Sequence, residues 1–363
     1  MAKRIGILTG GGDCPGLNAA IRAVVKHAHW THGWDVVGIK DGFAGTYDKR
    51  FVDLTPAGVG NLLARGGTIL GSSNRANPFA FPIRLPNQKE EVHDVSEACV
   101  ANIEQLELEA VVMVGGDGTM SIGQKLMDKG LKVVGVPKTI DNDLEATEYT
   151  IGFQTAVEVA MAAIDRLHTT AESHDRVIIC EVMGRYAGWI ALTAGLATGA
   201  DVILVPEMDY DIERGVQTLH RRRGRGHSYS IAVVAEGAKP EGEDYAVLAK
   251  GDATKQERLG GAGHRLAEAI RQRTEYDVRV SVLGHILRGG APCAFDRNLA
   301  TRFGVKAVDL IAEGRFGEVA ALRSGSIVSA PLEKAVAKLK LVDPSSDLVG
   351  AAAATGVELG VKV

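Results

Sequence analysis

The 363-residue sequence has few cysteines, no long hydrophobic run and no excess of charge of either sign. Its four cysteines are so far apart in the chain that neither a CxxC pair nor a Cys/His zinc spacing occurs. A chain of this length can bury a large core without disulfide bonds. We therefore expect a protein of the reducing cytoplasm.

The balance of charge bears on the partners of the protein. The 41 basic and 45 acidic side chains leave a net charge of -4, which gives no electrostatic reason for a nucleic-acid or membrane partner. No stretch approaches the roughly 20 apolar residues of a transmembrane helix. The first residues, Met1 to Arg4, lead into a short apolar segment and then glycines, without the pattern of a signal peptide. We expect small-molecule substrates, no nucleic acid and no membrane.

Short runs rich in Val and Ile alternate with longer amphipathic or Ala-rich stretches. This pattern is typical of repeated βα units and a parallel sheet, and the length allows two domains. The predicted strands are Ile5 to Thr9, Val36 to Ile39, Ala110 to Val114, Val133 to Val136, Val177 to Glu181, Val202 to Val205, Ser230 to Ala235 and Val278 to Leu283. The predicted helices include Ala19 to Ala28, Val157 to Leu167, Leu259 to Gln272 and Leu299 to Ala312. Two polar stretches, Asn74 to Val92 and Lys239 to Glu257, are predicted to be surface loops.

Glycine is abundant, at 44 of 363 positions, and it gathers where predicted strands end. Gly10 to Asp13 follows the first strand, Gly115 to Thr119 follows a second, and Pro137 to Asp143 follows a third. Such turns present backbone N–H groups and a helix N-terminus to an anion, at the sheet edge where open α/β folds bind ligands. The turns therefore suit phosphates, although Gly10 to Gly12 alone is equally compatible with a tight turn that has no ligand.

The carboxylates of the second and third turns indicate chemistry beyond phosphate binding. A metal ion held by Asp117 would neutralise phosphates cradled by Gly115 to Thr119, unless Asp117 is simply the N-cap of a helix near Ser121. In an extended loop Asp141 and Asp143 would point the same way. One could take a proton from a substrate hydroxyl while the other supports metal-bound water, as phosphoryl transfer to an alcohol requires. An Asx-turn is the alternative without chemistry.

The second half of the chain ends its strands with cationic side chains. Arg185 follows one strand, and His285 and Arg288 follow another, where an arginine offers a bidentate fork for phosphate. Glu236 could accept hydrogen bonds from a sugar hydroxyl or cap the following loop.

Two other arginines lie near the starts of their strands. Arg176 and Arg279 would therefore point to the opposite edge of the sheet, where within one chain they look structural or solvated.

Seven segments, in this order and at these separations, resemble the phosphofructokinase family: GGGDCPGLNA, GGTILGSS, GGDGT, PKTIDND, EVMGR, AEG and LGHILRGG. The resemblance runs from about Arg4 to Gly290. GGDGT also occurs in NAD kinases and lipid kinases, but those lack PKTIDND and LGHILRGG. A relative of those kinases and an inactive sugar-phosphate sensor are competing interpretations; the sensor is disfavoured because Asp117, Thr139, Asp141 and Arg185 are all present.

The resemblance implies an α/β fold of two Rossmann-like three-layer domains with mostly parallel sheets. Residues 1–152 plus roughly 288–338 would bind the phosphoryl donor, and 153–287 plus roughly 339–363 the sugar phosphate. The segment from about Ala291 would supply helices to both domains.

The implied activity is transfer of a phosphoryl group from ATP, with Mg²⁺, to the C1 hydroxyl of fructose 6-phosphate, the committed step of glycolysis. Asp141 would be the base, Asp117 the magnesium ligand, and Asp143 an aid to the metal or the base. Thr139 and Arg185 would stabilise the transferring group. The residues implied to hold the donor are Gly12, Arg75, Gly115, Gly116, Asp117, Gly118 and Thr119. The residues implied to contact the sugar phosphate are Thr139, Asp141, Met183, Gly184, Arg185, Glu236, His285 and Arg288.

The family places Arg176 and Arg279 in the active site of a neighbouring subunit, which implies a homotetramer or homodimer. Arg75 is chosen as the donor-contacting arginine although many relatives have it one position earlier, where this chain has Asn74.

Gly118 and Lys138 bear on the donor. The pyrophosphate-using branch typically has Asp and Lys at these positions, and typical bacterial ATP enzymes have Gly at both. An Asp at 118 would intrude on and repel the α-phosphate, whereas Gly118 leaves that space open. Lys138 suits either donor. We therefore predict ATP, with a pyrophosphate-dependent fructose 6-phosphate 1-phosphotransferase as the alternative.

Overall fold

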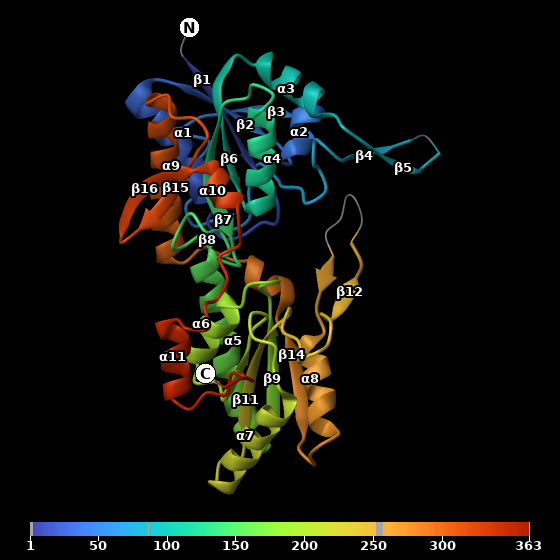
Figure 1. The fold of residues 1–363 in the computed structure, drawn as a ribbon. Helices are drawn as coiled ribbons and strands as arrows, with labels where there is room; N and C mark the ends of the chain where they lie inside the picture. The colour runs from blue at the N-terminus through green and yellow to red at the C-terminus, as the bar shows by residue number, and fades with distance from the viewer. Residues whose placement is uncertain (1–2, 86, 252–256, 363) are drawn as a thin grey trace. The chain divides into compact units, whose positions relative to one another are not determined.

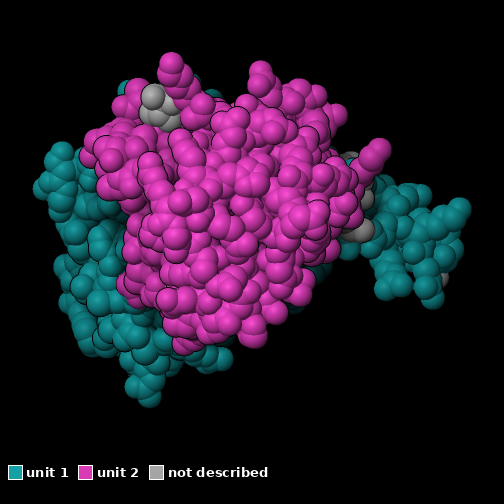
Figure 2. Space-filling view, turned by 90° about the horizontal axis from the view of Figure 1, so that it is seen from below, with its two compact units in different colours: residues 1–154, 251–256, 288–339 teal, residues 155–250, 257–287, 340–363 magenta. Residues whose placement is uncertain are grey.

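The computed structural model describes residues 3–85, 87–251 and 257–362 (Figure 1). The chain divides into two compact units, each with its own mostly parallel sheet. Unit 1 comprises Met1–Gln154, Gly251–Gln256 and Arg288–Leu339, and unit 2 comprises Thr155–Lys250, Glu257–Leu287 and Lys340–Val363 (Figure 2). The predicted α/β fold class is confirmed.

The sheet of unit 1 has the strand order β16-β15-β7-β6-β1-β2-β3, and the short β8 pairs with β7. The central strands are parallel, and β3 and β16 are antiparallel edges. The strands are β1 (Arg4–Thr9), β2 (Asp35–Ile39), β3 (Phe51–Leu54), β6 (Leu108–Gly115), β7 (Val133–Thr139), β8 (Ile151–Gly152), β15 (Glu318–Arg323) and β16 (Ser326–Pro331). Parallel strands covered on both faces are apolar throughout, which is why β1, β2, β6 and β7 were predictable from their Val- and Ile-rich runs.

Helices cover both faces of this sheet (Figure 1). Helices α1 and α9 pack on each other, while α2, α3, α4 and α10 contribute to one core cluster with the opposite face. Alternation along β6 separates the faces, because Val111 and Met113 belong to that cluster. The helices are α1 (Leu17–His32), α2 (Phe43–Tyr47), α3 (Ser96–Glu104), α4 (Asp117–Met127), α9 (Ala294–Ala312) and α10 (Leu332–Val336).

The sheet of unit 2 is parallel, with the order β10-β11-β9-β14. Its strands are β9 (Val177–Val182), β10 (Val202–Leu204), β11 (Ser230–Ala235) and β14 (Val278–Val282). The helices are α5 (Phe153–Ser173), α6 (Trp189–Ala197), α7 (Ile212–Gly224), α8 (Ala262–Arg271), α11 (Asp347–Ala354) and the 3₁₀ helix η1 (Gly284–Arg288).

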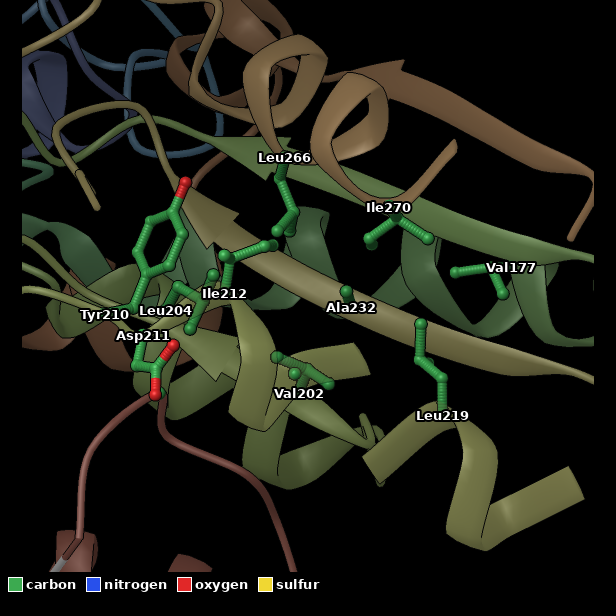
Figure 3. Close-up of a pocket in the computed structure, with 12 residues that line it drawn as sticks. Val177, Val202, Leu204, Tyr210, Asp211, Ile212, Leu219, Ala232, Leu266 and Ile270 are labelled. Atoms are coloured by element: carbon green, nitrogen blue, oxygen red, sulfur yellow. The ribbon is translucent and has the colours of Figure 1, made fainter. Parts of the chain in front are cut away.

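A small apolar cavity lies in the core of unit 2, where α7 and α8 cover the sheet. Leu219 of α7 and Leu266 and Ile270 of α8 surround it together with Val177 and Ala232 of the sheet (Figure 3). Its volume of about 10 Å³ is at the lower limit for one water molecule. The cavity is therefore part of the hydrophobic core and offers no room for a substrate.

Each of the two predicted surface loops contains a strand that belongs to a hairpin, so the loop predictions are wrong in part. β4 (Phe81–Arg84) pairs with β5 (Glu90–His93), and β12 (Val247–Ala249) pairs with β13 (Arg258–Leu259). Every side chain of β5 and β12 is exposed, so neither segment shows the alternation by which a half-buried strand is recognised. Positions 252–256 of the second loop lie outside the described residues.

The segment after Ala291 supplies helices to both units, as predicted, through α9 and α10 in unit 1 and α11 in unit 2. It also supplies the hairpin of β15 and β16, which extends the unit 1 sheet beyond β7 and was not predicted. Among the helices of the described residues, none combines the length and apolar character needed to cross a membrane.

Candidate active site

Three turns with chemically active residues follow β1, β6 and β7, which are neighbouring parallel strands of the unit 1 sheet. Gly10 to Asp13 follows β1, Gly116 joins β6 to α4, and Ile140 to Asp143 follows β7. Parallel neighbours end at one edge, so the three turns share the carboxyl edge of this sheet.

Thr119 of α4 joins the first two turns. A Cβ atom on Gly10 would lie 2.5 Å from Thr119 Oγ1, and one on Gly115 would overlap the same side chain. The Gly10 backbone N–H also donates to the carbonyl oxygen of Val114, at 2.9 Å. These two glycines are therefore required by close packing, which holds the first turn against the start of α4.

The start of α4 is open toward the space in front of it. Its N-cap is Gly116, so Asp117 is the first helical residue and the alternative of Asp117 as N-cap is wrong. Asp117 and Gly118 are exposed, and a Cβ atom on Gly118 would meet no heavy atom within 4 Å. Backbone N–H groups in a first helical turn have no partner within the helix, and they favour an anion.

The loop after β7 is a turn and not the extended segment expected from the sequence. Asn142 has φ 53°, and its amide accepts from the Thr150 N–H at 3.1 Å and donates to the Glu148 carbonyl oxygen at 3.2 Å. The Asp141 N–H donates to Thr139 Oγ1 at 3.1 Å. The side chain that shapes this loop is therefore Asn142, a residue to which the sequence analysis gave no role.

The carboxylates of this edge influence one another. Burial, and then the negative charges of Asp141 and Asp117, raise the pKa of Asp143 to about 7. The Oδ1 atom of Asp143 is buried and has no hydrogen-bond partner in the described part of the chain. A bound cation would reduce the repulsion between these carboxylates and would give the Asp143 oxygen a partner. Carboxylate oxygens are ligands that Mg²⁺ prefers, so these residues fit Mg²⁺.

Lys138 lies under the first turn and is only 3% exposed. Its ammonium group donates to the carbonyl oxygen of Gly12, and burial is the main cause that lowers its pKa. The cation predicted beside the phosphates is therefore attached to the turn that would hold them.

Two arginines of unit 1 lie near these turns. Arg288 donates from Nη1 to the Asp13 carbonyl oxygen at 3.3 Å, and a Cβ on Gly12 would lie 2.8 Å from the same atom. Arg75 forms an ion pair with Glu90 of β5 at 2.5 Å. The partner of Arg75 comes from the hairpin that the sequence analysis missed.

In unit 2, the turn after β9 carries Met183, Gly184 and Arg185 at the carboxyl edge. Gly184 has φ 147°, and a Cβ there would lie 2.5 Å from the Ala187 carbonyl oxygen. Arg185 also has a positive φ, 47°, which is uncommon for a residue with a side chain.

The strained Arg185 backbone is held by a carboxylate. Its N–H donates to Glu236 Oε1 at 3.2 Å, and its Nη2 donates to the Glu257 carbonyl oxygen at 3.0 Å. Glu236 follows β11, and His285 is exposed in η1 after β14, so both share this edge with Arg185.

The structure places Arg176 and Arg279 at the amino ends of β9 and β14. Both pair with Asp277, each at 2.8 Å, and the hydrogen bond from Arg176 is the main cause that lowers the pKa of Asp277. Arg279 remains 56% exposed. Because β9 and β14 are neighbours, Arg176 and Arg279 lie close together, at the sheet edge opposite to the Arg185 turn.

Glu181 is a buried residue of β9 that the sequence analysis did not single out. Its carboxylate accepts from the Gly261 N–H at 3.0 Å and from the Gly263 N–H at 2.8 Å, at the start of α8. The Gly-rich turn before α8 is therefore capped by the protein itself.

Comparison with known proteins is consistent with this arrangement. Residues 4–311 match the family model described as Phosphofructokinase. The chain is similar to a protein of Chloroflexus aggregans named ATP-dependent 6-phosphofructokinase, with 50% identity over 99% of this chain and 98% of the relative. It is also similar to one of Amycolatopsis methanolica named pyrophosphate–fructose 6-phosphate 1-phosphotransferase, with 52% identity over 94% and 96%. A solved phosphofructokinase of Saccharomyces cerevisiae matches 92% of this chain but only 45% of its own, with 30% identity and a TM-score of 0.77.

Proposed function

The chain belongs to the phosphofructokinase family, and from this premise we propose that it transfers the γ-phosphoryl group of ATP to the C1 hydroxyl of fructose 6-phosphate. The products are fructose 1,6-bisphosphate and ADP, and the step is the committed one of glycolysis. The observation that carries the proposal is the carboxyl edge of unit 1, where an open helix start lies among Asp117, Asp141 and Asp143.

Asp141 is the general base in this proposal. It is 6% exposed, and its backbone N–H is fixed to Thr139 Oγ1. Its carboxylate takes the C1 hydroxyl proton as the C1 oxygen bonds to the γ-phosphorus and the bond to the bridging oxygen of ADP breaks. A general base of this kind typically contributes about 10²- to 10⁴-fold to the rate.

Asp117 and Asp143 are the residues that would hold Mg²⁺. The ion supplies charge neutralisation for the donor phosphates when bound. The donor phosphates lie on the N–H groups at the start of α4 and the turn of Gly12, with the Lys138 cation attached to that turn. Thr139 and Arg185 stabilise the charge that develops on the transferring group.

Gly118 supports ATP as the donor. Relatives named for ATP and for pyrophosphate have nearly the same identity to this chain, 50% and 52%, so overall similarity does not separate the donors. A nucleoside triphosphate needs room beyond its β-phosphate, and Gly118 has no heavy atom within 4 Å of the place of a Cβ. Lys138 is the observation that favours pyrophosphate, because this residue type is typical of that branch.

The remaining residues of the proposal are assigned to the sugar phosphate. Met183, Gly184 and Glu236 contact the sugar, and Glu236 is already fixed on the Arg185 backbone. His285 and Arg288 bind the 6-phosphate through charge-assisted hydrogen bonds.

Arg176 and Arg279 serve the 6-phosphate of a neighbouring subunit in this proposal. Their shared partner Asp277 holds them together, and the protein acts as a homodimer or homotetramer.

The test is the rate of fructose 1,6-bisphosphate formation from fructose 6-phosphate and Mg²⁺, with ATP and pyrophosphate assayed in parallel. Activity with ATP alone supports the proposal. Activity with pyrophosphate alone would replace the donor and keep the acceptor, whereas no product with either donor would remove the proposed function.

A further inference from the structure

A cluster of two histidines and an aspartate lies where α1 and α9 pack together in unit 1 (Figure 1). His27 and His32 are on α1, and Asp309 is on α9. One ligand atom from each lies within 4.8 Å of the others. At a rise of about 1.5 Å per residue, His27 and His32 are about 15 and 22 Å along α1 from Leu17, the end that follows the phosphate turn. The cluster is thus distinct from the candidate active site.

The contacts inside the cluster leave one nitrogen unused. His27 Nε2 lies 2.7 Å from Asp309 Oδ1, and His27 Nδ1 lies 3.0 Å from Thr31 Oγ1. His32 Nε2 is buried and has no hydrogen-bond partner among the residues that the structure describes. The His32 ring stacks on Trp34, with centroids 4.6 Å apart, and meets the His27 ring edge-on at 5.5 Å. An ordinary His–Asp pair accounts for His27 and Asp309 but not for the orphan nitrogen.

We propose that His27, His32 and Asp309 bind a divalent transition-metal ion of the zinc type. Two imidazoles and a carboxylate are the ligands such an ion prefers, whereas Mg²⁺ prefers oxygen alone. Three protein ligands leave one position for water, as in exchangeable zinc sites.

The geometry needs only small movements to close on an ion. Ligands about 2.0–2.2 Å from a tetrahedral ion are about 3.4 Å from one another. The three ligand atoms lie within 4.8 Å of one another, so no pair has to contract by more than about 1.4 Å, and His27 and Asp309 separate by about 0.7 Å. Thr31 is the outer partner: when His27 presents the lone pair of Nε2 to the ion, its Nδ1–H donates to Thr31 Oγ1.

The bound ion joins two helices that are far apart in the sequence, so it stabilises the folded unit over the unfolded chain. The predicted consequence is a metal-dependent rise in the melting temperature that needs no substrate.

The test is a titration of the full chain with Co²⁺ in millimolar Mg²⁺, which keeps oxygen-only sites filled, followed by visible absorption. We expect ligand-field bands that Zn²⁺ abolishes, and binding that is at least 10-fold weaker in His32→Gln. His29→Gln is the matched control, because His29 is exposed on the same helix and outside the cluster; its Co²⁺ affinity should equal that of the unchanged protein.

Zn²⁺ should also raise the melting temperature of the unchanged protein and of His29→Gln, but not of His32→Gln. If His32→Gln does not fold, Asp309→Asn removes the anionic ligand and should weaken Co²⁺ binding likewise. The absence of visible bands would overturn the proposal. Equal Co²⁺ affinity in His32→Gln and His29→Gln would also overturn it. So would thiolate charge-transfer bands that persist in His32→Gln, because they would show that Co²⁺ binds to cysteine.

Discussion

Both units contain a Gly-rich turn that leads from a strand into a helix, but the two helix starts are used differently. Before α4 the turn is Gly115 and Gly116, and the only carboxylate in the first helical turn is Asp117, which does not cap the helix. Before α8 the turn is Gly260 and Gly261, and Glu181 accepts from the N–H groups of that helix. The Gly-rich turn in unit 1 therefore leaves the start of α4 without a side-chain cap, whereas the Gly-rich turn in unit 2 is capped by Glu181.

The difference lies in what the rest of the chain places in front of each helix. At α4 the space above Gly118 is empty, whereas at α8 a Cβ on Gly263 would lie 3.2 Å from Glu181. A glycine-rich pattern thus shows where an anion could bind, and the tertiary fold decides whether the site stays open.

The largest effect is expected from the residue proposed as the general base, Asp141. Asp141→Asn should lower kcat by about 10²- to 10⁴-fold, because the amide cannot take the C1 proton, while nucleotide affinity stays within about 3-fold. Steady-state kinetics and calorimetric nucleotide binding measure the two quantities. Asp128→Asn, at the exposed C-cap of the same α4, is the control, and a near-normal kcat in Asp141→Asn would refute the role of Asp141.

A carboxylate at the open start of α4 should change the preference for the phosphoryl donor. Gly118→Asp should reduce kcat/KM for ATP by about 10²-fold or more and affect pyrophosphate use far less, because a carboxylate there repels the α-phosphate. Gly118→Ala is the matched control: its methyl group meets no heavy atom within 4 Å, so ATP use should be kept. Equal losses with both donors in Gly118→Asp would exclude repulsion of the α-phosphate as the feature that selects the donor.

Removing the carboxylate that caps α8 should lower the free energy of unfolding. Glu181→Ala leaves the Gly261 and Gly263 N–H groups without their acceptor, so we expect a loss of about 2 kcal/mol. Chemical denaturation monitored by circular dichroism measures it. Glu97→Ala removes a carboxylate whose side chain is 91% exposed, and should change stability by less than about 0.5 kcal/mol. A Glu181→Ala protein as stable as Glu97→Ala would show that the cap contributes nothing.

The smallest effect is expected at the rim of the open site. Arg75→Ala should raise KM for ATP by about 10-fold, the loss of one charge-assisted contact, with little change in KM for fructose 6-phosphate. Arg84→Ala, on the adjacent β4, is the control and should leave both constants unchanged. An unchanged KM for ATP in Arg75→Ala would remove Arg75 from the donor site.

The Gly-rich turn before α4 was easier to predict from the sequence than the Glu181 cap of α8. The residues of the turn are close together in the sequence, whereas those of the cap are far apart. Gly115 to Thr119 lie within five positions between a buried strand and a helix, so their placement follows from local pattern. The Glu181 cap depends on a contact between residues about 80 positions apart, which no local pattern reveals.

Three further features were missed for physical reasons that differ from one another. The ion pair of Arg75 and Glu90 needs a hairpin whose second strand is fully exposed and therefore has no alternating pattern. Arg288 lies beside Gly12 although the two residues belong to different chain segments of unit 1. Asn142 shapes the loop after β7 through its left-handed conformation, which a sequence alone does not reveal.

Amide hydrogen exchange, measured with and without Mg²⁺ and a non-hydrolysable ATP analogue, tests the contrast between the helix starts most directly. We expect slower exchange in peptides that cover residues 115–121 and no change in peptides that cover 260–266. Protection of 260–266 in place of 115–121 would contradict this expectation, because the donor would then lie at the start of α8, which Glu181 caps.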